Sequence, residues 1–209
     1  MSRLAILGAS GHGKVVADTA MLTKRWDEVH FYDDTYLVGA KVEHWDILGD
    51  TNTLIHNYRL YDSFIVAIGD NSVRHKKHLI VESCGLSPAV LIHPNAIVSQ
   101  YSSVGRGSVV FAGAIINAFS NVGITAIINT GATIDHDCSI GDAVHISPGV
   151  NLCGSVKVGN FSWICVGASI KPEVKIANNV TIGAGAVVIN NVPDPGIYTG
   201  VPATKVYSL

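Results

Sequence analysis

The chain has 209 residues, a formal net charge of -2 and a charged content of only 14%. This balance excludes a basic surface for nucleic acid or anionic lipid, so neither a nucleic-acid partner nor insertion into a membrane is expected. A hydrophobic content of 48% with 21 glycines allows a real core and many tight turns, which suits short stacked strands.

The start of the chain and its cysteines bear on the compartment. Residues 1–7 lead straight into a strand-like run and a glycine-rich turn, without the apolar stretch and cleavage site of a signal peptide. No apolar run approaches the length of a membrane span. The four cysteines form no C-x-x-C pair, which favours reduced thiols over a metal site. We therefore expect a cytoplasmic protein without a metal.

Residues 1–90 alternate between strand and helix patterns. Apolar strands are predicted over residues 4–7, 28–32 and 64–68, a helix over residues 14–25, and a further helical stretch up to residue 83. This alternation predicts a parallel sheet, which binds ligands at the carboxyl ends of its strands. The first domain, residues 1–90, is thus predicted to be an α/β, Rossmann-like domain.

A glycine-rich turn, G-x-x-G-x-G, follows the first strand at residues 8–13. At a helix N-terminus such a turn presents backbone N–H groups to a phosphate, although a plain strand-to-helix connection fits equally well. Gly11 would leave room for the phosphate and could require a positive φ. Asp33 and Asp34, at the end of the second strand, could hold a ribose hydroxyl or form a solvated turn.

The second half, residues 91–209, carries a six-residue repeat. Cut into hexads from Leu91 to Val192, the chain has Ile, Val or Leu at all seventeen second positions and a small residue or Val at every sixth. A period of six excludes an α-helix and predicts a parallel β-helix of triangular coils, with the aliphatic residue inward and about 5.7 coils of 18 residues. Pro193 and Pro195 should end the repeat and begin a C-terminal cap.

His136 is the candidate catalytic residue. Ile134 takes the inward position of its hexad, so His136 should lie on the outer surface, between Asp135 and Asp137. Neighbouring carboxylates orient an imidazole and stabilise the imidazolium that forms when it accepts a proton. An ordinary surface histidine in a polar turn is the alternative.

Stacking by 18 residues places Gly154 over His136. The missing side chain leaves space beside the imidazole, and the backbone N–H could serve a carbonyl oxygen. Asn129 lies seven residues upstream of the histidine and could fix an acceptor.

Four segments resemble a known family. They are residues 8–14 (GASGHGK), residues 33–34, residues 68–71 together with Arg74, and residues 129–145 (NTGATIDHDCSIGDAVH). Together with the hexads they resemble the hexapeptide-repeat sugar acyltransferases related to the bacillosamine-pathway and sialic acid O-acetyl enzymes, over essentially the whole chain. The resemblance implies a left-handed β-helix, whereas general crossover rules would favour a right-handed one.

The resemblance implies an acetyl-CoA-dependent N-acetyltransferase, a homotrimer with active sites between subunits, that acts on a UDP-linked 4-amino-4,6-dideoxy sugar. It implies that His136 is the general base, that Asp137 raises its basicity and that Asn129 binds the amine. It implies a nucleotide-sugar site at Ser10, Gly11, His12, Asp33, Asp34 and Gly69, and an acetyl-CoA groove at His145, Gly154, Val166 and Ala184. Asp137 departs from the bacillosamine-type relatives, which have the longer Glu there.

Other functions fit less well or remain open. A sialic acid or other sugar O-acetyltransferase would use the same base and cofactor, and a GDP- or dTDP-linked amino sugar could replace the UDP-linked one. An NAD-dependent oxidoreductase is disfavoured because about 90 residues make only half of a dinucleotide fold and the turn spacing is wrong. A purely structural or ice-binding β-helix would need a regular outward ladder of one residue type, which the hexads lack.

Overall fold

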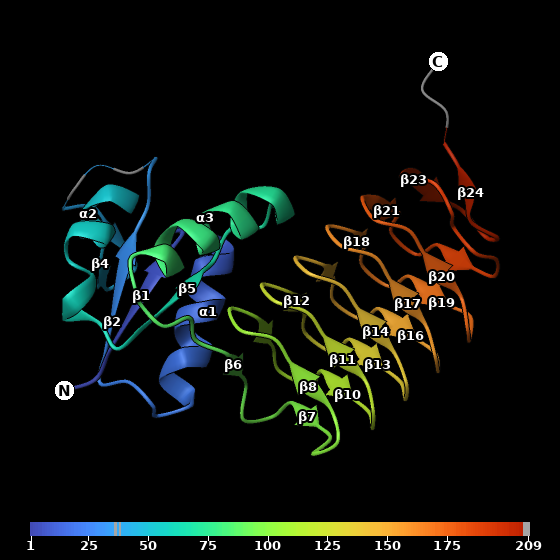
Figure 1. Cartoon of the computed structure of the whole chain (residues 1–209), viewed down its shortest axis with the longest axis horizontal. Coiled ribbons are helices and arrows are strands. Elements are labelled where there is room, and N and C mark those ends of the chain that lie inside the picture. Colours follow the sequence, from blue (N-terminus) through green and yellow to red (C-terminus); the bar gives the residue numbers. More distant parts are fainter. Residues whose placement is uncertain (36, 38, 207–209) are drawn as a thin grey trace. The chain divides into compact units, whose positions relative to one another are not determined.

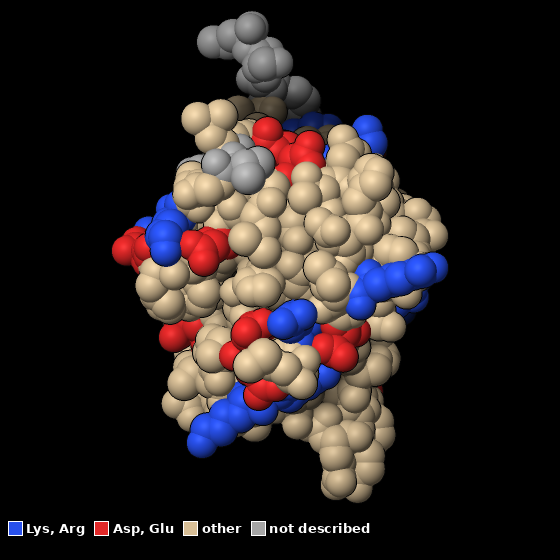
Figure 2. Space-filling model, turned by 90° about the vertical axis from the view of Figure 1, so that its left-hand side faces the viewer, with Lys and Arg blue, Asp and Glu red and all other residues tan. Residues whose placement is uncertain are grey.

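The chain folds into an α/β unit followed by a β-solenoid (Figure 1). The computed structural model describes residues 1–35, 37 and 39–206. Contacts between Cα atoms divide the chain into Met1–Pro94 and Asn95–Leu209. Among the described residues, no helix is long and apolar enough to cross a membrane. Acidic and basic side chains are interspersed on the face of the molecule shown in Figure 2, in line with the small net charge.

The first unit contains a three-stranded parallel sheet in the order β2-β1-β5. The first unit as a whole contains the strands β1 Arg3–Leu7, β2 Glu28–Tyr32, β3 Lys41–Val42, β4 Trp45–Asp46, β5 Ser63–Val66 and β6 Leu91–Ile92, of which β1, β2 and β5 form this sheet. Its helices are α1 Gly11–Leu22, α2 Thr51–His56, the 3₁₀ helix η1 Tyr58–Leu60 and α3 Asn71–Ser83. The predicted parallel α/β sheet is confirmed.

Both faces of this sheet are buried. Side chains alternate between the two faces along β1, and all of those from Leu4 to Leu7 are buried. Ala5 and Leu7 belong to one core cluster with Leu54 of α2 and Val81 of α3. Leu4 and Ile6, also fully buried, point to the opposite face, and α1 is the helix that contacts β1. With both faces covered, the carboxyl edge of the sheet is where a ligand can approach.

Three parts of the first unit differ from the sequence prediction. Helix α1 begins at Gly11 rather than residue 14, because the chain passes from the extended N-cap Ser10 directly into helical backbone. The short helix α2 and the β3–β4 hairpin were not predicted. Both are too short to show a hydrophobic period.

The solenoid confirms the hexads. Seventeen strands, β6 to β22, each begin at or next to the first position of a hexad. The first face consists of β7 Ile97–Val98, β10 Ile115–Ile116, β13 Thr133–Ile134, β16 Asn151–Leu152, β19 Ser169–Ile170 and β22 Val187–Val188. The second face consists of β8 Ser103–Val104, β11 Asn121–Val122, β14 Ser139–Ile140, β17 Lys157–Val158 and β20 Lys175–Ile176. The third face contains β9 Val109–Val110, β12 Ile127–Ile128, β15 His145–Ile146, β18 Trp163–Ile164 and β21 Val180–Ile182.

Residues 18 positions apart pair in parallel, as Ile116, Ile134 and Leu152 do. From Val110 to Val188 the second residue of every hexad is buried, as predicted. The prediction is wrong for Ile92, which is 36% exposed, and Val98 and Val104 are only half-buried. These residues belong to the first hexads, which have no preceding coil to pack against.

The chain turns at the fifth hexad position. Six glycines and eight other residues there have φ between 53° and 72°, among them Asp137 at 59°. A turn of this kind requires a positive φ at its second central residue. Each of the three edges of the solenoid is therefore a column of such turns.

The C-terminal cap is more ordered than predicted. After Pro193 and Pro195 the chain forms β23 Gly196–Thr199, which pairs in parallel with β21. It then reverses into β24 Thr204–Lys205, antiparallel to β23. The prolines interrupt the repeat, but the following strand continues the third face.

Candidate functional site

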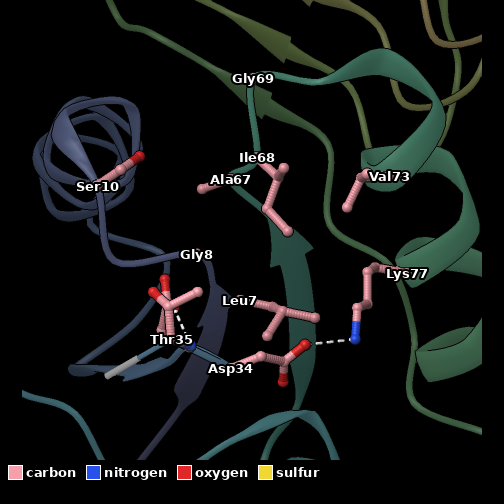
Figure 3. Close-up of a pocket in the computed structure, with 11 residues that line it drawn as sticks. Leu7, Gly8, Ser10, Asp34, Thr35, Ala67, Ile68, Gly69, Val73 and Lys77 are labelled. Carbon is pink, nitrogen blue, oxygen red and sulfur yellow. Dashed lines mark hydrogen bonds and ion pairs between the residues drawn. The ribbon is translucent and has the colours of Figure 1, made fainter. Parts of the chain in front are cut away.

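A pocket of about 290 Å³ lies at the carboxyl ends of β1, β2 and β5 (Figure 3). In the order β2-β1-β5 the chain leaves the central strand β1 to one side and later returns on the other, and open α/β sheets bind ligands at such a switch point. The pocket is lined by Leu7, Gly8, Ser10, Asp33, Asp34, Thr35, Ala67, Ile68, Gly69, Val73 and Lys77.

The glycine turn shapes the pocket through Gly8 and Gly13. Gly8 has φ +118°, and a Cβ atom there would lie 2.5 Å from the Ala67 carbonyl oxygen. A Cβ atom on Gly13 would lie 2.2 Å from the Gly8 carbonyl oxygen. The possible positive φ at Gly11 is not found, because Gly11 is the first residue of α1, and a Cβ atom there would meet nothing within 4 Å. Gly11 is not among the lining residues.

Asp33 ties the end of β2 to the glycine turn. Its Oδ2 accepts a hydrogen bond from the Ala9 N–H at 2.7 Å. Its Oδ1 accepts from the Thr35 N–H at 2.8 Å and from the Thr35 hydroxyl at 2.7 Å. The carboxylate thus holds two pocket loops in place while it lines the pocket.

Asp34 connects the loop after β2 to helices α2 and α3. Its Oδ1 accepts hydrogen bonds from the Thr51 N–H and hydroxyl, and its Oδ2 lies 2.5 Å from Lys77 Nζ (Figure 3). Burial acts to raise the pKa of the Asp34 carboxyl, but the hydrogen bonds from Lys77 and Thr51 lower it overall. Lys77 was not predicted. Its spacing of four from Val73 on α3, which brings both side chains to one helix face, was the available signal.

Arg74 holds the loop after β5, of which Ile68 and Gly69 line the pocket. It is 1% exposed and donates to the carbonyl oxygens of Ile68 and Gly69 at 3.0 Å and to Asn71 Oδ1 at 2.7 Å. Burial lowers its pKa to about 10. Burial and the charge of Arg74 lower the pKa of His12 to about 4, so His12 is neutral at pH 7. His12 is not among the residues that line the pocket.

Ser10 and Gly69 both line the pocket (Figure 3). Ser10 is the N-cap of α1, and its side chain makes no capping hydrogen bond. The hydroxyl therefore remains beside the positive end of the helix, where an anion is stabilised.

A second group of residues lies on the first edge of the solenoid, which joins the first face to the second. His136 and Asp137 form the turn after β13, and His136 Nδ1 lies 2.8 Å from Asp137 Oδ2. A carboxylate only accepts hydrogen bonds, so Nδ1 carries the proton and Nε2 is left as the basic atom. The hydrogen bond to Asp137, followed by the charge of Asp135, raises the pKa of His136.

Asp135 fixes the same turn from the other side. Its Oδ1 accepts from the His136 N–H at 2.8 Å and from Asn117 Nδ2 at 2.9 Å. The Asn117 hydrogen bond lowers the pKa of the Asp135 carboxyl. Asp135 thereby holds the His136 backbone, while Asp137 holds its imidazole.

Gly154 lies against the imidazole of His136, as the 18-residue spacing predicts. A Cβ atom on Gly154 would lie 2.6 Å from both His136 Cε1 and Nε2. No side chain fits at residue 154 while the ring keeps this position. The basic edge of the imidazole therefore faces bare backbone.

A third group lies on the third face and the edge that follows it. Asn129 Oδ1 accepts from the Thr130 N–H at 2.8 Å, which turns Asn129 Nδ2 toward His145 Nε2 at 3.3 Å. The His145 ring is stacked on Trp163 with 5.7 Å between centroids and 5° between planes. Trp163 Nε1 in turn donates to Ser147 Oγ at 2.8 Å. Trp163 was not predicted, although it lies one 18-residue coil after His145.

The expected active-site residues fall on two edges of one chain. Asn129, Val166 and Ala184 follow strands of the third face, whereas His136 and Gly154 follow strands of the first. One side of a coil, on the order of 15 Å of extended chain, separates the two edges. Among the described residues, no group of three or more His, Cys, Asp or Glu side chains could hold a metal.

Known proteins resemble both units. Residues 3–79 match the family described as the PglD N-terminal domain. The acetyltransferase domain of PglB from Neisseria gonorrhoeae FA1090, solved in complex with acetyl coenzyme A, is 38% identical with a TM-score of 0.94, and the alignment covers 98% of each chain. PerB from Caulobacter crescentus, solved in complex with CoA and GDP-perosamine, is 36% identical with a TM-score of 0.93 over 99% of this chain and 98% of that one.

A curated relative, UDP-N-acetylbacillosamine N-acetyltransferase from Bacillus subtilis (strain 168), is 36% identical over 117 residues, or 54% of this chain. The matched segment spans 52% of that relative's length. The likeness to the two solved structures extends over both units, which agrees with the parallel α/β sheet and the uninterrupted solenoid described above. The chain belongs to the family of hexapeptide-repeat sugar N-acetyltransferases that carry a PglD-type N-terminal domain.

Proposed function

We propose that this chain transfers the acetyl group of acetyl-CoA to the amino group of a nucleotide-linked amino sugar. The observation that carries the proposal is the His136 imidazole, held at Nδ1 by Asp137 with its Nε2 edge against the bare backbone of Gly154. This is the geometry of a general base beside an open site. The relatives solved with acetyl coenzyme A and with GDP-perosamine supply the two ligand classes.

In the proposed reaction the amine attacks the thioester carbonyl carbon as the free base. The N–C bond forms while His136 Nε2 accepts a proton from the amine, and Asp137 stabilises the imidazolium. The C–S bond then breaks, and the CoA thiolate leaves and takes up a proton. We assign the Gly154 N–H to the carbonyl oxygen, where a fixed donor stabilises the developing negative charge.

The two ligands are assigned to different units. The nucleotide and its phosphates would bind the first-unit pocket beside Ser10, Asp33, Asp34 and Gly69, with Lys77 as an added cation. Acetyl-CoA would lie along His145, Val166 and Ala184 and reach Gly154. The acceptor amine would donate to Asn129 Oδ1 in place of the Thr130 hydroxyl, which is the longer of its two donors at 3.4 Å, against 2.8 Å for the Thr130 N–H.

We infer that the complete site forms between chains of a homotrimer. His136 and Asn129 of one chain lie on different edges of the solenoid, too far apart to contact the same amine. A site that uses both residues must therefore take His136 from one chain and Asn129 from a neighbouring chain. A C₃ ring closes such contacts between unlike surfaces.

The substrate that we propose is a UDP-linked 4-amino-4,6-dideoxy sugar, with the GDP-linked sugar next in order. The test is a panel of UDP-, GDP- and dTDP-linked 4-amino sugars with acetyl-CoA, in which released thiol is measured and free sialic acid serves as an O-acetylation control. The UDP-linked sugar should give the highest kcat/KM. If the panel is inert and sialic acid is acetylated, N-acetylation is the wrong reaction.

His136→Ala is the companion variant. Loss of the base should lower kcat by about 10² to 10⁴ while acetyl-CoA still binds. His56→Ala is the control, because His56 is an exposed histidine of α2 in the first unit. Equal activity of the two variants would show that His136 is not the base.

A further inference from the structure

An exposed pair of aromatic rings lies on the same edge of the solenoid as His136. Tyr101 is 62% exposed and Phe119 is 61% exposed. Their rings are stacked with 5.5 Å between centroids and 23° between planes. Exposed aromatic rings of this size in one place mark a binding surface more often than isolated apolar residues do.

The register of the coils fixes where this pair lies. Phe119 is 18 residues before Asp137, and Ala118 is 18 residues before His136. Adjacent coils are about 4.8 Å apart, so Phe119 lies one coil from the His136–Asp137 pair. On the other side of that pair the corresponding positions are occupied by Ser155 and Glu173. The aromatic surface is confined to one side of the candidate base.

The two sides of the imidazole are therefore different. Its Cε1–Nε2 edge faces Gly154, the side that we assigned to the thioester. On the opposite side lies the small residue Ala118, which is flanked by the exposed ring of Phe119. The small side chain of Ala118 leaves space beside the imidazole, and the ring of Phe119 borders this space on one side.

We propose that Phe119, backed by Tyr101, is the subsite for the hexose ring of the acceptor and favours a 6-deoxy sugar. This inference rests on the proposed function. The amine must come within about 3 Å of His136 Nε2, and we assign the Gly154 side of the ring to the thioester. The hexose that carries the amine is therefore left with the Ala118 side, where Phe119 lies one coil away. A C–H face and a 6-methyl group are suited to an aromatic wall, whereas a 6-hydroxyl would lose hydrogen bonds to water there.

The selectivity should be moderate. A hydrophobic wall lowers kcat/KM for a substrate with an added hydroxyl by at most about 100-fold, because the hydroxyl loses water without meeting a steric clash. We expect the 6-deoxy amino sugar to be preferred over its 6-hydroxy counterpart by roughly 10- to 100-fold.

The test compares Phe119→Ala with Phe161→Ala. Both phenylalanines occupy the fifth hexad position with φ 63° and 61°, but Phe161 lies on the edge between the second and third faces. Alanine is compatible with this backbone, since Ala143 adopts φ 53° at the same hexad position. The kinetics of both variants are measured with 6-deoxy and 6-hydroxy amino-sugar nucleotides and with acetyl-CoA.

We expect Phe119→Ala to raise KM for the 6-deoxy substrate about tenfold, to reduce the preference for it at least about fivefold, and to leave KM for acetyl-CoA unchanged. Phe119→Tyr should keep the preference, and Phe161→Ala should change neither constant. An unchanged preference in a folded Phe119→Ala variant overturns the subsite.

Sedimentation distinguishes a sugar subsite from the competing explanation, a contact between chains. If Phe119→Ala dissociates the assembly, the aromatic pair is a contact between chains, and the subsite is overturned. The proposed function fails differently, because the wild-type chain would then acetylate none of the amino sugars. If circular dichroism shows that Phe119→Ala has lost its fold, Phe119→Asn, which tolerates the positive φ and removes the apolar wall, replaces it and must show the same loss of preference.

Discussion

At the scale of single residues, Asp137 shows how a short carboxylate reaches its histidine. Asp has one methylene fewer than Glu, yet the Oδ2 of Asp137 lies 2.8 Å from His136 Nδ1. The backbone of Asp137 is left-handed, with φ 59°. This conformation belongs to the turn of the edge, so the solenoid itself places the two adjacent side chains for the contact.

Asp137→Asn should shift the pH dependence of activity toward lower pH. The base must be neutral, so activity is lost as pH falls through the pKa of His136, which Asp137 raises. Without that carboxylate the pKa falls, and the acidic limb of kcat/KM moves down, while the plateau drops by about 10-fold or more because the imidazolium is less stabilised. The measurement is a rate profile between about pH 5 and pH 9.

Asp135→Asn is the matched comparison, because Asp135 acts on His136 through its charge and not through an imidazole hydrogen bond. Its acidic limb should move less than that of Asp137→Asn. An acidic limb that stays in place or moves to higher pH in Asp137→Asn would contradict the assigned contact.

Some site residues could be predicted and others could not. The contact between His136 and Gly154 follows from the period of 18, because stacked coils place such residues one above the other. The same period places Trp163 beside His145, but a tryptophan in a hexad is compatible with many roles, and a lysine on a helix such as Lys77 has no repeat to place it. The contact of Lys77 with Asp34 and the ring stacking of Trp163 on His145 appear only once the chain is folded.

At the scale of elements, Asp33 joins the glycine turn after β1 to the loop after β2. Asp33→Ala removes the acceptor of the Ala9 N–H and of both Thr35 donors. We expect KM for the sugar nucleotide to rise about 5- to 50-fold, KM for acetyl-CoA to stay constant, and the free energy of unfolding to fall by about 1–3 kcal/mol. Steady-state kinetics and urea denaturation measure these effects.

Asp46→Ala is the control for Asp33→Ala, because Asp46 is an exposed aspartate of β4 that pairs with Lys41. It should leave both KM values unchanged. If Asp33→Ala instead weakens acetyl-CoA binding and spares the sugar nucleotide, the first unit holds CoA and the assignment of the two ligands is reversed.

The elements of the two units differ in how well the sequence predicts them. Every side of a coil has the same length and the same inward residue, so the strands of the solenoid could be predicted individually. In the first unit, α2 is held by contacts such as that of Thr51 with Asp34, which have no local pattern. The start of α1 was misplaced because the glycine turn continues into the helix without a break.

At the scale of the whole molecule, we expect a trimer whose sites each use two chains. Sedimentation at micromolar concentration should give three times the monomer mass. Inactive His136→Ala and Asn129→Ala chains, dissociated and reassembled together in equal amounts, should regain roughly a quarter of wild-type activity, because each site has a one-in-four chance of receiving both intact residues.

The two variants reassembled separately are the controls and should remain inactive. No regain in the mixture, with mixed trimers shown to form, would mean that one chain supplies both residues. A fully active monomer would remove the need for a shared site altogether.

The left-handed turns along the edges also have a consequence for heat tolerance. Eight residues other than glycine adopt this backbone, at which an ordinary side chain is disfavoured by about 1 kcal/mol. Asn179 already has the side chain that tolerates it best. Glu173 has φ 65°, and its backbone N–H donates to the Gly154 carbonyl oxygen at 3.0 Å. Glu173→Asn keeps this backbone hydrogen bond and should raise the melting temperature by a few degrees without changing kcat. The melting temperature of the solenoid can therefore be raised by substitutions at the turns along its edges.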